Sequence, residues 1–123
     1  MIRTFLLLIA VLVLTGCGQS DEDVLRERAE TYAGVLHAGP SAEEVVPFVV
    51  PSAGRELQAE QMAEQWQNPE AEISDFSVDA VDVDGNQAVV EFTVVATHEG
   101  EEVVGTDATL WRKVDGTWYR DLD

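Results

Sequence analysis

The 123-residue sequence is poor in cysteine and in basic side chains. It contains one cysteine, Cys17, so no disulfide can form within the chain. Seven lysines and arginines stand against 24 aspartates and glutamates, which gives a formal net charge of −17 at pH 7. This charge argues against nucleic acid as a partner, because its phosphates need a basic face. It also argues against a domain that lies flat on anionic lipid headgroups.

The residues needed for several common kinds of site are also missing. The only histidines, His37 and His98, are far apart and have no neighbouring histidine or cysteine to complete a zinc site. No serine lies in a Gly-x-Ser-x-Gly elbow, and no glycine-rich loop is suited to phosphate. Acids in the segment 82–91 are spaced as in a calcium loop, but Ala80 occupies the first ligand position, where it cannot bind a cation. We therefore predict a hairpin there, and a protein with no metal and no cofactor.

Long apolar runs are scarce as well, and the longest lies near the N-terminus. It extends from Phe5 to Leu14, and in a helix it would reach about 15 Å, against a hydrocarbon core of ~30 Å. Arg3 precedes the run, and small residues followed by Cys17 end it. A short positive region, a short apolar run and a small-residue end are typical of a secretory signal peptide and not of a transmembrane helix.

The last four residues of this segment, LTGC, resemble the lipobox of bacterial lipoproteins. The resemblance implies cleavage between Gly16 and Cys17 and attachment of a diacylglyceryl group to the sulfur of Cys17. Two acyl chains anchor a protein stably, whereas one chain anchors it only marginally. The expected location is extracytoplasmic, lipid-anchored to the cell membrane or, in a bacterium with two membranes, to the outer membrane. The expected parts are a signal peptide, a lipidated tether and a folded domain, over residues 1–16, 17–20 and 21–123.

The first half of the domain has the periodicity of helices. The spacing of apolar residues predicts helices over 21–38, after the cap Ser20, over 41–48, and over 52–68. Apolar residues on one face of the first helix are Leu25, Ala29, Tyr32, Ala33 and Leu36. Those that share a face of the third are Leu57, Met62, Ala63 and Trp66.

The second half of the domain alternates with the period of strands. Four strands are expected, as an antiparallel meander over 73–83, 87–98, 102–114 and 117–122. The apolar parity changes along the first strand, which predicts a bulge near Ala80. In the third strand, Ala108 and Leu110 are expected to face the core. Helices followed by a meander predict an α+β fold, with N-terminal helices packed on a curved four-stranded antiparallel sheet.

Two segments resemble the nuclear transport factor 2-like (NTF2-like) superfamily, the cystatin-like cone that also contains ketosteroid isomerase. One is the end of the first helix, residues 32–39 (YAGVLHAG), and the other is the stretch 108–119 (ATLWRKVDGTWY). The resemblance extends over residues 21–123 in the order of the expected elements, and it implies a cone of helices and curved sheet. It assigns no function, because this superfamily includes enzymes, binding proteins and assembly modules.

Where the helices meet the sheet in such a cone, the facing side chains can line a cavity. Tyr32 would be a polar handle among apolar walls, as binding pockets commonly have. Trp111 has the opposite parity to Leu110, so we predict it on the outer face of the sheet, with Val89 and Val95, as a surface for a partner. The alternative is that Trp111 covers the next strand. The expected cavity lining is Tyr32, Leu36, Trp66, Val90, Phe92 and Val94.

Two functions are compatible with these residues, besides a purely structural lipoprotein. The favoured one is a non-catalytic module at the membrane that binds a protein partner or a small apolar ligand. The alternative is a small isomerase- or dehydratase-like enzyme acting on an apolar ligand, since the resemblance to ketosteroid isomerase implies carboxylates and a tyrosine inside the cone. Asp79, Glu91 and Asp107 all have a parity opposite to the predicted core, so no catalytic residue is predicted. A buried carboxylate beside Tyr32 would favour the enzyme.

Overall fold

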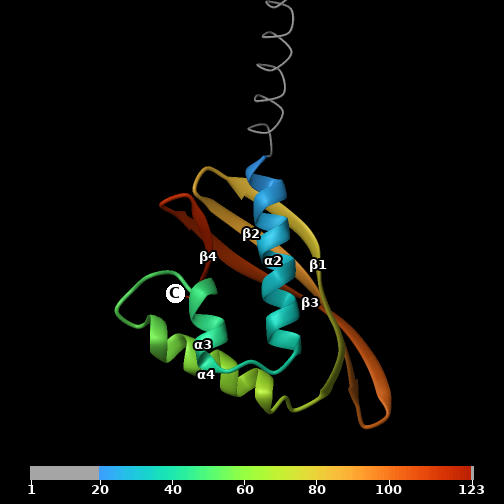
Figure 1. The fold of residues 1–123 in the computed structure, drawn as a ribbon. Coiled ribbons are helices and arrows are strands. Elements are labelled where there is room, and N and C mark those ends of the chain that lie inside the picture. Colours follow the sequence, from blue (N-terminus) through green and yellow to red (C-terminus); the bar gives the residue numbers. More distant parts are fainter. Residues whose placement is uncertain (1–19, 123) are drawn as a thin grey trace, which may run out of the picture.

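The computed structural model describes residues 20–122, so Cys17 and the predicted signal peptide lie outside the described residues. The elements are α2 (Asp21–His37), α3 (Ala42–Val45), the 3₁₀ helix η1 (Val46–Phe48), α4 (Arg55–Gln67), β1 (Glu72–Asp84), β2 (Gln87–His98), β3 (Glu101–Val114) and β4 (Thr117–Asp121). The strands form one antiparallel sheet in the order β1-β2-β3-β4, which confirms the predicted α+β meander. Figure 1 shows α2 lying along one face of this sheet, with α3 and α4 near its C-terminal end.

The helix α2 begins and ends where its sequence predicts. The Ser20 hydroxyl accepts a hydrogen bond from the Asp23 N–H at 3.1 Å, and acids in the first turn favour the positive end of the helix dipole. After His37 the chain turns at Gly39, whose φ of 75° suits glycine. The buried residues of α2 are the five that were predicted on its apolar face. Among residues 20–122, no helix combines the length and apolar character that a bilayer span requires.

The helix α4 differs from its prediction at its start, which was expected at residue 52, and at one apolar position. It begins at Arg55, after Gly54, and buries Ala59 and Ala63. Leu57 was predicted on the same apolar face, but its side chain is 59% exposed. That prediction was wrong because the buried stripe of α4 follows its two small alanines.

The sheet carries the predicted bulge in β1. Val78 pairs with Phe92 and Ala80 with Glu91, so Asp79 is an extra residue and the parity of β1 reverses there. Val81 and Val83, beyond the bulge, pack against the core as Phe76 and Val78 do before it. A second register shift, at Ser74, was not predicted.

The parity predicted for β3 was wrong. Leu110 is 52% exposed on the outer face, whereas Trp111 is 1% exposed and belongs to the core. Trp111 pairs with the inward-facing Ala88, and directly paired residues share a face of the sheet. Its indole N–H donates to the Thr109 hydroxyl at 2.9 Å, and that hydroxyl donates to the Val90 carbonyl at 2.8 Å. The buried tryptophan therefore has the polar partner that it needs.

Aromatic rings form the centre of the core, between α2 and the inner face of the sheet. The ring of Tyr32 lies edge-on to Trp111 at 5.1 Å between centroids, and tilted against Phe48 at 5.6 Å and Phe92 at 5.9 Å. Phe76 stacks on Phe92 at 4.7 Å. Such aromatic pairs contribute about 0.5–1.5 kcal/mol each beyond the area that they bury.

The two ends of α2 lie against different ends of the sheet. At its N-terminal end, Lys113 forms an ion pair with Asp21 at 2.8 Å. At its C-terminal end, Nε2 of His37 bonds the carbonyl oxygen of Ile73 in β1 at 3.0 Å. The helix has 17 residues, so these ends are about 25 Å apart (Figure 1).

Candidate functional site: a cavity between α4 and the sheet

A cavity of about 460 Å³ lies between the end of α4, the segment that leads into β1, and the inner face of the sheet. This volume is within the range of small-molecule sites. The exposed Asn68 and Glu70 form part of its rim. The full lining is Gln65, Trp66, Asn68, Pro69, Glu70, Ala71, Ile73, Val94, Ala96 and Asp107.

One side of the cavity is apolar. The indole of Trp66 lies 4.6 Å from the ring of Phe76, which supports it from the core side. Ile73 and Ala96 are paired across β1 and β2, and Val94 continues the same face of β2. Trp66 and Val94 were both predicted to line the cavity, and both do.

The other four predicted lining residues lie deeper, in the closed part of the core. Tyr32 is 3% exposed, and Leu36, Val90 and Phe92 are buried as completely. None of them lines the cavity, so that part of the prediction is corrected. The physical reason is Trp111, because its indole fills the space beside Tyr32 that the prediction had left open.

Asp107 is a lining residue that the sequence analysis missed. It pairs with Phe92, so it lies on the inner face of the sheet, at the cavity and not opposite the core. The error has the same origin as that at Trp111, because both follow from the parity of β3. The signal that would have found it is the length of the β2–β3 turn. A turn of two residues, Glu99 and Gly100, pairs His98 with Glu101 and so brings Asp107 opposite Phe92.

The Tyr32 hydroxyl lies inside the core, away from the cavity lining. It donates a hydrogen bond to the sulfur of Met62 at 3.1 Å. Burial raises the pKa of Tyr32 to about 12, the positive charge of Arg120 opposes this rise, and the negative charge of Asp107 adds to it. The phenol is therefore neutral near pH 7. The one hydrogen of the neutral hydroxyl is already donated to the Met62 sulfur.

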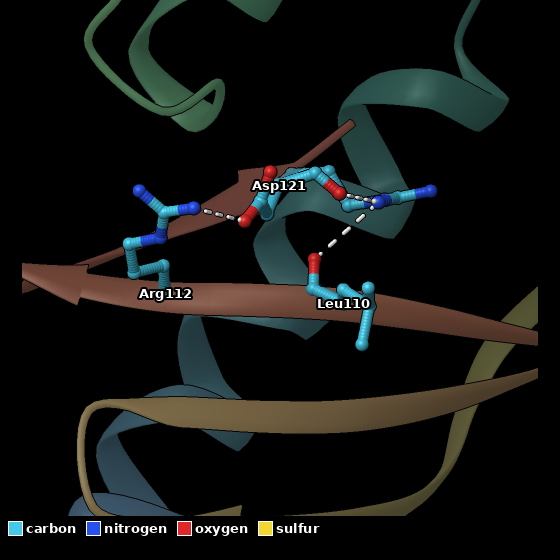
Figure 2. A network of polar contacts seen from close by, with 4 residues as sticks. Leu110, Arg112 and Asp121 are labelled. Atoms are coloured by element: carbon cyan, nitrogen blue, oxygen red, sulfur yellow. Dashed lines mark hydrogen bonds and ion pairs between the residues drawn. The ribbon is translucent and has the colours of Figure 1, made fainter. Parts of the chain in front are cut away.

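Arg120 is held beside Tyr32 by the C-terminal end of the sheet. Its Nη1 donates to the carbonyl oxygen of Leu110 at 3.3 Å and to that of Asp121 at 2.6 Å. Figure 2 labels these two acceptor residues. The carboxylate of Asp121 forms an ion pair with Arg112 at 2.7 Å in the same network. These contacts fix β4 on β3 and position the charge that acts on Tyr32.

Other surface features are less suited to bind a ligand. Two hollows between α3 and α4 are lined mainly by glutamate and glutamine side chains and contain no aromatic residue. Among residues 20–122, no three histidine, cysteine, aspartate or glutamate side chains are grouped to hold a metal ion. Trp111 was predicted to form an apolar patch with Val89 and Val95 on the outer face of the sheet, but it is buried. The residues that pair with these two valines there are Leu110 and Val104, and both are exposed.

Comparison with known proteins supports the fold. No family model matches the chain, and no curated protein matches it. A solved structure named Rd1NTF2_05, with five substitutions in its name, has 18% identity and a TM-score of 0.63, covering 82% of this chain and 95% of its own. A SEC-C motif containing protein from Rhodopseudomonas palustris has 21% identity and a TM-score of 0.58 over 83% and 75%. A "putative NTF2-like transpeptidase" from Campylobacter jejuni has 12% identity and a TM-score of 0.55 over 79% and 96%.

Proposed function

We propose that this NTF2-like domain is a binding module, anchored to the outside of a membrane through lipid on Cys17. Its cavity beside Trp66 takes up a small apolar ligand or an apolar side chain of a protein partner. The observation that carries the proposal is the composition of this cavity, in which Trp66, Ile73 and Val94 form an apolar wall next to a few polar groups at the rim. Pockets that bind small molecules usually have this composition.

The position of the cavity agrees with anchoring at Cys17. Ser20 caps α2, and three residue steps from Cys17 to Ser20 extend at most about 10 Å. The anchor is therefore close to the N-terminal end of α2. The cavity lies at the other end, where Ile73 contacts His37. The proposed anchor and the cavity are thus at opposite ends of α2.

The binding of a neutral fluorescent probe, N-phenyl-1-naphthylamine, tests the cavity. Ala96→Phe places a ring in the cavity, so we expect the affinity for the probe to fall at least tenfold. The matched control is Ala80→Phe, the same change on the outer face of β1, where we expect less than a twofold effect. Circular dichroism checks that both variants remain folded. Equal affinities of the two variants would reject the cavity as the binding site.

The position of Asp107 favours a second candidate, the small isomerase- or dehydratase-like enzyme. Its carboxylate lines the cavity, and its charge acts on the buried Tyr32. In this role Asp107 would accept a proton from a ligand held against Trp66. General bases contribute about 10²–10⁴-fold to rate, so Asp107→Asn would remove that factor from any turnover while probe binding remains. A turnover that is unchanged in Asp107→Asn contradicts the enzyme and leaves the binding module.

A further inference from the structure

Two arginines on the other side of the domain lie over one tyrosine ring. The guanidinium carbon of Arg28 in α2 is 5.7 Å from the centroid of Tyr119, and that of Arg55 in α4 is 5.6 Å from the same centroid. Arg28 also lies over Phe48, at 4.4 Å. Stacking on aromatic faces restricts the orientation of a guanidinium plane. Both arginines are only half-buried, so solvent and solutes reach them.

The hydrogen bonds of these arginines use part of their donors. Arg28 donates through Nε to the Trp118 carbonyl at 3.0 Å and through Nη2 to the Pro47 carbonyl. Arg55 donates through Nε to the Val46 carbonyl at 3.0 Å. Within residues 20–122, Nη1 of Arg28 and both Nη atoms of Arg55 make no hydrogen bond. The backbone contacts thus fix each side chain and leave N–H groups for a further acceptor.

Neither arginine has a carboxylate partner among the described residues. Within residues 20–122, ion pairs join Arg26 to Glu22, Arg112 to Asp121, and Lys113 to Asp21. This is unexpected in a chain with 24 acids. The pKa of Arg28 is lowered mainly by burial and further by the like charge of Arg55, while Tyr119 opposes the change. Among residues 20–122, these two positive charges therefore lie near each other with no carboxylate paired to either.

We propose that Arg28 and Arg55 form a binding site for an oxyanion, the phosphate or carboxylate group of a soluble ligand. Guanidinium groups bind both kinds of oxyanion through charge-assisted, often bidentate hydrogen bonds. Arg55 is also the first residue of α4, whose N-terminus has Gly54 at the cap and no side-chain cap bond. The positive end of the helix dipole adds to the two guanidinium charges. The site is separate from the cavity beside Trp66 and does not depend on a ligand bound there.

Titration of the detergent-solubilised full-length chain, followed by amide chemical shifts, tests the site. One arm uses inorganic phosphate and the other uses citrate, in about 0.15 M salt, where charges beyond ~8 Å are largely screened. This screening limits repulsion of the anion by the distant acids. We expect saturable shifts around Arg28, Arg55 and Tyr119. Saturation by phosphate alone identifies a phosphate site, and saturation by citrate alone identifies a carboxylate site.

The variant Arg55→Gln should weaken the affinity for the saturating anion at least tenfold. Arg26→Gln is the matched control, because Arg26 loses the same charge but pairs with Glu22 on α2. We expect that control to change the affinity less than twofold. Arg55→Lys keeps the positive charge but loses the bidentate hydrogen bonding of the guanidinium. Its affinity for the anion should therefore lie between those of wild type and Arg55→Gln. Absence of saturation in both arms, or equal weakening by Arg55→Gln and Arg26→Gln, would overturn the proposal.

Discussion

At the scale of single residues, the hydroxyl of Tyr32 shows how one polar atom is accommodated in an aromatic core. Its acceptor is the sulfur of Met62, and Arg120 provides the nearby positive charge. A thioether is a weak acceptor, so this hydrogen bond contributes little. The ring contacts with Phe48, Phe92 and Trp111 hold the side chain in place.

The first prediction concerns the stability of Tyr32→Phe at neutral pH and at high pH. At pH 7 we expect a loss of at most about 0.5 kcal/mol in the free energy of unfolding, the lower end for one hydrogen bond, because the thioether acceptor is weak. The pKa of Tyr32 is raised to about 12 in the folded chain and is about 10 in an unfolded chain. Between these two pKa values the folded state keeps the Tyr32 proton and the unfolded state loses it. The free energy of unfolding is therefore unaffected by this group below pH 10 and falls as the pH rises from 10 to 12.

Urea denaturation of wild type and Tyr32→Phe between pH 7 and pH 12 measures this effect. Between pH 10 and pH 12 the free energy of unfolding should fall by about 2–3 kcal/mol more in wild type than in the variant, because only wild type has the Tyr32 hydroxyl. Groups that both proteins contain, such as Tyr119 and Lys113, cancel in the difference. Parallel pH curves for the two proteins would show that the Tyr32 hydroxyl is not buried in solution.

At the scale of elements, the β2–β3 turn decides which side of β3 faces the core. Glu99 and Gly100 have φ values of 53° and 82°, so both central residues are left-handed. Two left-handed residues are characteristic of the type I′ turn, which favours asparagine first and glycine second. Glycine is in place at the second position, whereas glutamate at the first is strained.

Two substitutions in this turn should therefore change the stability in opposite directions. Gly100→Ala adds a Cβ at a positive φ, and we expect it to cost more than about 1 kcal/mol of unfolding free energy. Glu99→Asn introduces a residue that tolerates this conformation and should raise the melting temperature. Thermal unfolding by circular dichroism measures both. An equal loss in the two variants would contradict the type I′ conformation.

The same turn explains how far the sequence could predict the fold and the site. The helices, the order of the strands and the bulge near Ala80 follow from local patterns of period, caps and parity. The face of β3 follows instead from the pairing across the turn, and counting Glu101 as a turn residue shifts the register by one. With this shift, the prediction placed Leu110 on the inner face of the sheet and placed Trp111 and Asp107 on the outer face. The predicted lining was partly wrong because a closed core and an open cavity share the same alternating pattern.

At the scale of the whole molecule, the prediction that bears most on function is lipidation of Cys17. Mass spectrometry of the full-length protein expressed in a bacterium should show a mature chain that begins at Cys17 and carries a diacylglyceryl group. Cys17→Ser should abolish the modification and release the protein from the membrane fraction, because no acyl chain then anchors it. An unmodified mature chain that begins at another residue would reject the anchor.

If Cys17 carries the proposed lipid, the length of α2 limits how far from the bilayer the cavity can meet a partner. With the proposed anchor at the N-terminal end of α2 and the cavity near its C-terminal end, the helix separates the two by about 25 Å. Under this anchoring, the tether and the helix together keep the cavity within about 35 Å of the bilayer. A partner held within that distance of the bilayer would meet the cavity at a high effective concentration.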